Sequence, residues 1–277
     1  MKISVSMYSV HKVVQTEGWS PVDFVHFAKS IQADGVELLD IYWKDKEKEI
    51  PEVLKEVKEQ GLVVSAYDVT NNFVVESEEE RMQQVEKVKD GIRVAKQLGT
   101  NIVRTFCGDL SGDLTYEDGQ EWIVDGLKKA AEFAEQEEVY LAIENHGLLA
   151  GRSEQVEEII AKVGSPFVKS TFDTGNFLLV HQDPKQSFDR LKKEIVHVHF
   201  KDFRKKDPSE DVNGFRSMKG EELIGTIPGD GQVDLGYVVN GLNENGYDGW
   251  LSIEYEGVED PKEANLECVN RLKKLLS

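Results

Sequence analysis

Short apolar segments alternate with longer amphipathic segments from one end of the chain to the other. The apolar segments are hydrophobic on both faces, which is typical of parallel strands covered by helices. The amphipathic segments between them predict helices that pack on such a sheet. Eight strands are predicted in this way, at Lys2–Tyr8, Gly35–Leu39, Leu62–Tyr67, Asn101–Phe106, Val139–Glu144, Val168–Asp173, Ile195–Phe200 and Trp250–Glu254.

Capping residues mark the boundaries of the amphipathic segments. Ser20 before Pro21 supplies an N-cap and a first-turn proline, and Ser77 with Glu80 has the spacing of a capping box. Further helices are predicted to begin near Pro51, Thr115, Ser153, Asp234 and Pro261. A helix therefore follows most of the predicted strands.

Eight strand-then-helix units in 277 residues predict an α/β fold, a single (β/α)8 TIM barrel. A doubly wound open sheet is the main rival. However, no G-x-G-x-x-G motif follows the first strand, and the sequence has no P-loop. The composition shows no linker or second region, so one domain over residues 1–277 is expected.

The net charge indicates which kinds of molecule the protein binds. The chain has 52 acidic and 33 basic residues, a formal charge of −19, which argues against a nucleic-acid partner because such binding needs a basic surface. No apolar run is long enough to span a membrane, and the first residues lack the pattern of a signal peptide. The two cysteines, Cys107 and Cys268, are not spaced as metal ligands. A cytoplasmic protein that acts on small molecules is expected.

Four predicted strands end in, or carry near their end, a side chain that can bind a metal ion: Glu144, Asp173, His199 and Glu254. A TIM barrel places the carboxyl ends of all its strands on one face, where barrel enzymes have their active sites. Three carboxylates and one imidazole suit Mn²⁺, Mg²⁺ or Co²⁺, and also accommodate Zn²⁺. Each residue alone also has a structural interpretation, as an ion-pair partner, a helix cap, a core histidine or a solvated loop residue. Their shared position favours one metal-centred site.

The segments IENHG, FDTGN, HVHFKD and GYDGWLSIEYEG, with a G-x-G-x-x-D stretch at Gly229–Asp234, resemble the xylose isomerase-like barrel superfamily. This group includes sugar phosphate isomerases and epimerases, inosose dehydratases, ketose 3-epimerases and class II apurinic endonucleases. The resemblance implies that Glu144, Asp173, His199 and Glu254 hold the metal. It also implies that Glu144 and Glu254 are catalytic, exchanging a proton with substrate through an enediolate stabilised by the metal. Because relatives often form dimers or tetramers, it also allows a homo-oligomer.

Five further residues are candidates for substrate binding, each with an alternative. Arg104 would bind an anionic group or pair with a carboxylate, and His146 would reach substrate or cap a loop. Lys201 would neutralise the enediolate or pair with Asp202, and Tyr8 would line the pocket or simply pack. The remaining candidate, Asn176, stands where ketose 3-epimerases have a histidine.

Two departures separate this chain from ketose 3-epimerases. Besides Asn176, it has Ala150 where they have a substrate-binding glutamate, so free-ketose 3-epimerase specificity is not expected. The leading hypothesis is a divalent-metal-dependent isomerase or epimerase of a sugar or sugar phosphate, and the alternative is an inosose dehydratase-like lyase. An apurinic endonuclease-like phosphodiesterase is disfavoured, because Tyr8, Leu39 and Tyr67 end the first three strands and supply no extra ligands. A non-catalytic sugar-binding barrel is the last alternative.

Two local expectations complete the sequence-based description. His197 is predicted to face away from His199, with a supporting role toward the metal site. The segment from Asp202 to about Gly231 is predicted to be a long loop whose basic residues are balanced by acidic neighbours. The alternative for this loop is an anion-attracting lid.

Overall fold

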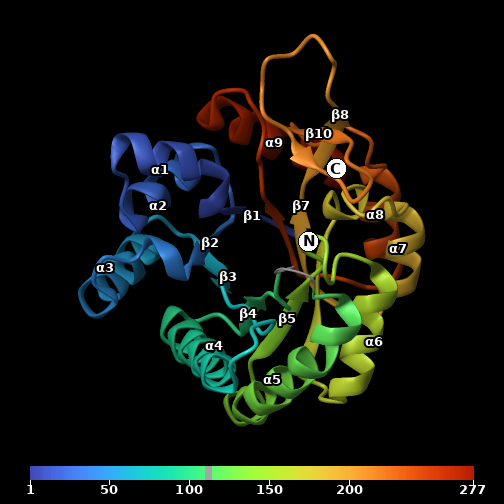
Figure 1. Cartoon of the computed structure of the whole chain (residues 1–277). Helices are drawn as coiled ribbons and strands as arrows, with labels where there is room; N and C mark the ends of the chain where they lie inside the picture. The colour runs from blue at the N-terminus through green and yellow to red at the C-terminus, as the bar shows by residue number, and fades with distance from the viewer. Residues whose placement is uncertain (110–113) are drawn as a thin grey trace.

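A closed barrel of eight parallel strands forms the centre of the molecule, with helices around it (Figure 1). The computed structural model describes residues 1–109 and 114–277. The barrel strands are β1 (Lys2–Ser6), β2 (Gly35–Leu39), β3 (Val63–Val69), β4 (Ile102–Thr105), β5 (Tyr140–Glu144), β6 (Val168–Asp173), β7 (Ile195–Phe200) and β11 (Trp250–Ile253). The predicted TIM barrel is therefore confirmed.

Strand pairing explains how distant residues reach one rim. Each strand pairs in parallel with its neighbours, and β1 closes the barrel by pairing with both β2 and β11. At the carboxyl ends, Asp173 of β6 is in register with His199 of β7, and Ser252 of β11 is in register with the same His199. The ends of the last four barrel strands thus lie side by side.

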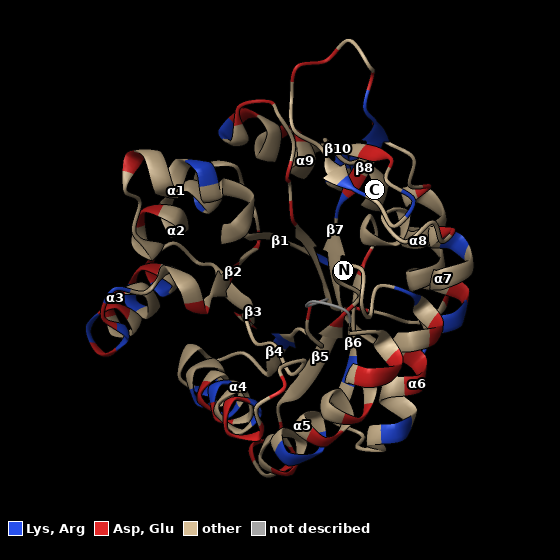
Figure 2. Ribbon diagram, in the orientation of Figure 1, with Lys and Arg blue, Asp and Glu red and all other residues tan. Residues whose placement is uncertain are grey.

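Helices cover the barrel with their apolar faces, and their charged residues lie on the outside (Figure 2). They are α1 (His11–Glu17), α2 (Pro21–Ser30), α3 (Lys46–Glu59), α4 (Glu78–Leu98), α5 (Tyr116–Glu137), α6 (Ser153–Val163), α7 (Pro184–Leu191), α8 (Leu235–Glu244) and α9 (Pro261–Leu276). Short 3₁₀ turns follow three barrel strands, at η1 (Met7–Val10), η2 (Asp40–Tyr42) and η3 (Asn176–Leu178). The hydroxyls of Ser20, Ser77 and Thr115 accept backbone hydrogen bonds at helix starts, which confirms these N-caps.

Several predicted boundaries differ from the structure by one or more residues, and two of these differences have a clear local cause. The first strand ends at Ser6 rather than Tyr8, because the Ser6 hydroxyl accepts the Tyr8 N–H and begins the turn η1. Helix α3 begins at Lys46 rather than near Pro51. The Glu49 carboxylate accepts the N–H groups of Lys44 and Asp45, the two residues that precede the helix. In the helix interior, Pro51 merely lacks one hydrogen-bond donor.

The segment after β7 is a small antiparallel sheet, and the prediction of a long loop is wrong in this respect. Its strands are β8 (Asp202–Lys205), β9 (Phe215–Arg216) and β10 (Glu222–Thr226), in the order β8-β10-β9. The sheet packs through Phe203 and Leu223 onto Leu179, which forms a separate apolar cluster beside the barrel. The sheet therefore lies next to the carboxyl rim of β7 (Figure 1).

Asp202 anchors this sheet to the chain that follows it. Its carboxylate accepts five backbone N–H groups at 2.8–3.0 Å, from Phe203, Gly229, Gly231, Gln232 and Val233. A Cβ atom on Gly231 would lie 2.1 Å from the carboxylate, so the close approach requires glycine there. The G-x-G-x-x-D stretch thus wraps around one buried carboxylate.

Replacing Asp202 by Asn is expected to lower the free energy of unfolding by about 1.5–3 kcal/mol, because the amide NH₂ cannot accept the hydrogen bonds that a charged oxygen accepts. Urea unfolding measures this loss. Asp207→Asn is the matched control, since Asp207 is exposed and, among residues 1–109 and 114–277, its carboxylate accepts only from Ser209. Equal stability of the two variants would contradict the anchoring role.

Candidate metal centre and active site

The four predicted ligands converge at the carboxyl rim of the barrel. Glu144 ends β5, Asp173 ends β6, His199 lies near the end of β7, and Glu254 follows β11. All four are buried, and each offers a ligand atom within 4.8 Å of the others. The Nδ1 atom of His199 lies 3.5 Å from an oxygen of Glu144 and 3.5 Å from an oxygen of Glu254. The structure thus brings together the residues that the strand ends predicted.

Three atoms of this group make no hydrogen bond within the described part of the chain, although they are buried: Oε2 of Glu144, Oδ2 of Asp173 and Nδ1 of His199. The other oxygens of the two carboxylates are engaged. Oδ1 of Asp173 accepts the N–H groups of Gly175 and Asn176, and Oε1 of Glu144 accepts from the Asn176 amide. The two unbonded oxygens instead contact cations, Oε2 of Glu144 with Arg104 and Oδ2 of Asp173 with Lys201, each at 3.2 Å. Buried polar atoms without a hydrogen bond are rare, and the short distances among the four residues fit a divalent ion bound between them.

Lys201 brings a positive charge to the same place. Its Nζ atom lies 3.2 Å from Oδ2 of Asp173, 2.5 Å from Glu254 and 2.6 Å from Glu256. The side chain is only 3% exposed, so these contacts are poorly screened by water. Lys201 therefore pairs with two of the predicted ligand carboxylates, those of Asp173 and Glu254, and with Glu256. The alternative prediction of a pair with Asp202 is wrong, because Asp202 faces the backbone of 229–233.

Arg104 of β4 lies on the other side of Glu144. Its guanidinium contacts Asp68 at 3.0 Å and Glu144 at 3.2 Å, and it is 2% exposed. It also stacks over the Phe106 ring, with 4.0 Å from the guanidinium carbon to the ring centroid. Of the two predicted roles, the structure shows the ion pair with a carboxylate.

Burial and charge act in opposite directions on the ionisable groups. Burial raises the pKa of Asp173 to about 7, although the Lys201 ammonium opposes this shift. Burial also raises the pKa of Glu144 and of Glu254, but nearby cations, His199 beside Glu144 and Lys201 beside Glu254, outweigh it and hold both pKa values below the ordinary range. Burial lowers the pKa of His199, while the carboxylates of Glu37, Glu254 and Glu144 raise it well above its ordinary value. Oppositely charged neighbours thus offset part of the cost of burying these groups.

A cavity of about 560 Å³ opens beside this cluster. It is lined by all five predicted substrate-binding residues, Tyr8, Arg104, His146, Asn176 and Lys201. The predicted ligands Glu144 and Glu254 also line it, together with Glu256. The volume lies in the usual range for a small-molecule site.

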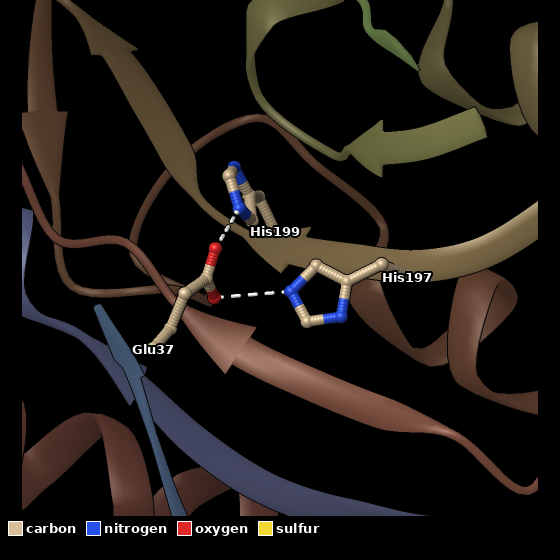
Figure 3. A group of neighbouring side chains, drawn as sticks. All are labelled: Glu37, His197 and His199. Atoms are coloured by element: carbon tan, nitrogen blue, oxygen red, sulfur yellow. Dashed lines mark hydrogen bonds and ion pairs between the residues drawn. The ribbon is translucent and has the colours of Figure 1, made fainter. Parts of the chain in front are cut away.

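Glu37 is a site residue that the sequence interpretation missed. It lies in β2 and is fully buried, and its carboxylate contacts Nε2 of His199 at 2.7 Å and Nε2 of His197 at 3.0 Å (Figure 3). The signal was present in the sequence, because a carboxylate inside the apolar strand GVELL requires a compensating partner. Asp68, the partner of Arg104 on β3, carries the same signal.

The predicted orientation of His197 is wrong. Both histidines of β7 are buried inside the barrel and contact the same carboxylate. The reason is the two-residue period of a strand, which places residues i and i+2 on one face. The supporting role predicted for His197 is consistent with this contact to Glu37.

The basic residues of the inserted sheet are mostly balanced by neighbouring acids, as expected. Arg204 contacts Glu210 at 2.6 Å, and Lys206 contacts Glu222 at 3.0 Å. Arg216 lines the cavity. No helix within 1–109 or 114–277 has the length and apolar character needed to cross a membrane.

Two comparisons of the sequence place the chain among known proteins. The sequence model of the family described as xylose isomerase-like TIM barrel matches residues 25–275. The inosose dehydratase of Lacticaseibacillus casei is 30% identical over 164 residues, which are 58% of this chain and 54% of that protein. The match therefore spans about half the length of this curated relative.

Solved structures share the fold. The probable 3-DHS dehydratase AsbF of Bacillus anthracis matches with a TM-score of 0.77 at 22% identity, over 99% of both chains. The D-psicose 3-epimerase of Clostridium cellulolyticum H10 also reaches 0.77, at 12% identity, over 100% of both chains. These low identities support the fold alone. With nearly its whole length matched by the family model, this chain belongs to the xylose isomerase-like TIM barrel family.

Proposed function

We propose that this protein is a metal-dependent lyase that removes water from a polyhydroxylated ketone of the inosose class. The observation that carries the proposal is the buried group of Glu144, Asp173, His199 and Glu254 beside a cavity of substrate size. The similarity to inosose dehydratases favours this alternative over the isomerase hypothesis that led from the sequence. The three carboxylates and the imidazole suit Mn²⁺, Mg²⁺ or Co²⁺, and Zn²⁺ also fits them.

The residues around the cavity divide the chemistry among them. When bound, the ion would stabilise the oxyanion that forms as a proton leaves the carbon next to the carbonyl. Either Glu144 or Glu254, both of which line the cavity, takes that proton. His146 lines the same cavity, with its ring centroid 4.1 Å from that of Phe106, and is placed to donate a proton to the departing hydroxyl. A carbon–carbon double bond forms as the hydroxyl leaves with the His146 proton as water. The glutamate then releases its proton and His146 takes one up from solvent, so the substrate loses one water in total.

Epimerisation is the second candidate function. Glu144 and Glu254 both line the cavity, so one can remove a proton from the substrate carbon and the other can return it. No hydroxyl leaves in that reaction. The two candidates therefore share the removal of a proton and differ in whether a hydroxyl or a returning proton completes the reaction.

Incubation of the Mn²⁺-loaded protein with an inosose in D₂O tests the proposal. A dehydratase yields a product that has lost one water, detected by mass spectrometry and by ultraviolet absorbance of the conjugated enol. Solvent deuterium in an unchanged carbon skeleton, without loss of water, would instead establish epimerase chemistry. If neither product appears with inososes, free sugars or sugar phosphates, the proposed function is wrong.

The affinity for the divalent ion is expected to fall as the pH is lowered. Binding requires the carboxylate form of Asp173, whose pKa is raised to about 7, and removes any proton from Nδ1 of His199. Below pH 7 each competing proton therefore weakens binding by up to about tenfold per pH unit. Titration calorimetry with Mn²⁺ between about pH 8 and about pH 6 measures this, and proton release is obtained by repeating it in buffers of different ionisation enthalpy. A constant affinity would contradict the competition.

A further inference from the structure

Glu37 occupies a place in the barrel that has no explanation in packing alone. It lies in the middle of β2 between Val36 and Leu38, and its side chain is fully buried. A carboxylate there loses its water and gains stability only from polar partners. Those partners are the two histidines of β7, which are 160 and 162 residues away in the sequence.

Each oxygen of Glu37 serves one histidine. Oε1 contacts Nε2 of His199 at 2.7 Å, and Oε2 contacts Nε2 of His197 at 3.0 Å (Figure 3). A carboxylate can only accept, so both Nε2 atoms must carry the hydrogen. This leaves Nδ1 of His199 as the nitrogen that faces Glu144 and Glu254, both at 3.5 Å.

His197 stabilises the arrangement from the side. Its ring lies at 81° to the ring of His199, with 5.5 Å between their centroids. Because one oxygen accepts from His197 and the other from His199, the Glu37 carboxylate cannot rotate without losing a hydrogen bond. The hydrogen bond that Nε2 donates to Glu37 therefore fixes the orientation of the His199 ring, and Nδ1 on the other side of the ring faces Glu144 and Glu254.

We propose that Glu37 is a positioning residue that holds His199 in its Nε2–H form, with Nδ1 directed at the divalent ion, and so sets the affinity for that ion. The inference rests on the metal centre proposed above. Glu37 does not line the cavity and is not one of the four clustered candidate ligands. Partners of this kind typically change metal affinity 10–100-fold.

A different arrangement of the same atoms is the competing interpretation. Glu37, His197 and His199 also offer ligand atoms within 4.8 Å of one another, as a second ion would require. The contacts of 2.7 and 3.0 Å are ordinary hydrogen-bond lengths, which favours the positioning role. The number of ions bound per chain separates the two.

The test compares Mn²⁺ binding by the wild-type protein, Glu37→Gln, Glu37→Ala and Val36→Ala. Wild type is expected to bind one ion, and Glu37→Gln and Glu37→Ala to bind it about 10–100-fold more weakly. Val36→Ala is the matched control: Val36 is buried in the same strand, so this variant loses stability but keeps the wild-type affinity. Nitrogen-15 NMR of the Zn²⁺-loaded wild type is expected to show His199 with its proton on Nε2.

Each outcome decides a separate question. If wild type binds no ion, the metal centre fails, and this inference fails with it. If wild type binds one ion and Glu37→Gln binds equally well, only the positioning role is overturned. Two ions per chain, one of them lost in Glu37→Ala, would make Glu37 a ligand. Should the Glu37 variants not fold, the wild-type spectrum still decides, because a proton on Nδ1 of His199 would overturn the inference.

Discussion

Replacing Glu144 or Glu254 by Gln is expected to abolish turnover while the barrel stays folded. An amide cannot accept the substrate proton, and loss of a general base alone costs about 10²–10⁴-fold in rate. The loss of an anionic ligand adds to this effect. Gln has nearly the same shape as Glu, so packing at the ends of β5 and β11 is preserved. Product formation is measured with and without added Mn²⁺, and circular dichroism reports the fold.

Glu256→Gln is the matched control for these variants. Glu256 lines the same cavity and contacts Lys201 at 2.6 Å, but it is not one of the four clustered ligands. This variant is expected to retain most of the activity. Metal content measured for every variant separates loss of the ion from loss of the base. Full activity of both Glu144→Gln and Glu254→Gln would refute the roles assigned to the two glutamates.

Replacing Lys201 by Met is expected to destabilise the metal-free protein by about 3–5 kcal/mol, the typical cost of removing one partner from a buried ion pair. Asp173, Glu254 and Glu256 would lose the ammonium that contacts all of them. A divalent ion restores positive charge to two of these carboxylates. Saturating Mn²⁺ is therefore expected to narrow the difference in melting temperature between the variant and wild type.

Lys185→Met provides the comparison for this effect. Lys185 contacts Asp234 at 2.6 Å, but its side chain is 45% exposed, and exposed ion pairs contribute little to stability. Thermal unfolding of both variants, each with and without Mn²⁺, measures the effect of burial. If Lys201→Met were as stable as Lys185→Met without metal, Lys201 would not be the counter-charge that stabilises these carboxylates in the metal-free protein.

Much of the fold is readable from local sequence patterns. The apolar strands, the caps at Ser20, Ser77 and Thr115, and the repeated strand–helix order all report on neighbouring residues, and the barrel is implied by their number. Where the predicted elements were wrong, the cause is a side-chain hydrogen bond or a contact between segments distant in the sequence. Glu49 extends α3 ahead of Pro51 by capping, and the sheet β8-β10-β9 forms through pairing between segments separated by loops.

The sequence alone determined the chemical character of the site, because Glu144, Asp173, His199 and Glu254 stand at positions that a closed parallel barrel must bring to one rim. Only the tertiary structure decided how those side chains are held. Glu37 contacts His197 and His199 across the barrel, and the structure shows which of several nearby carboxylates Lys201 and Arg104 contact. These pairings depend on distances between strands far apart in sequence and on competition among buried charges. A linear pattern contains neither.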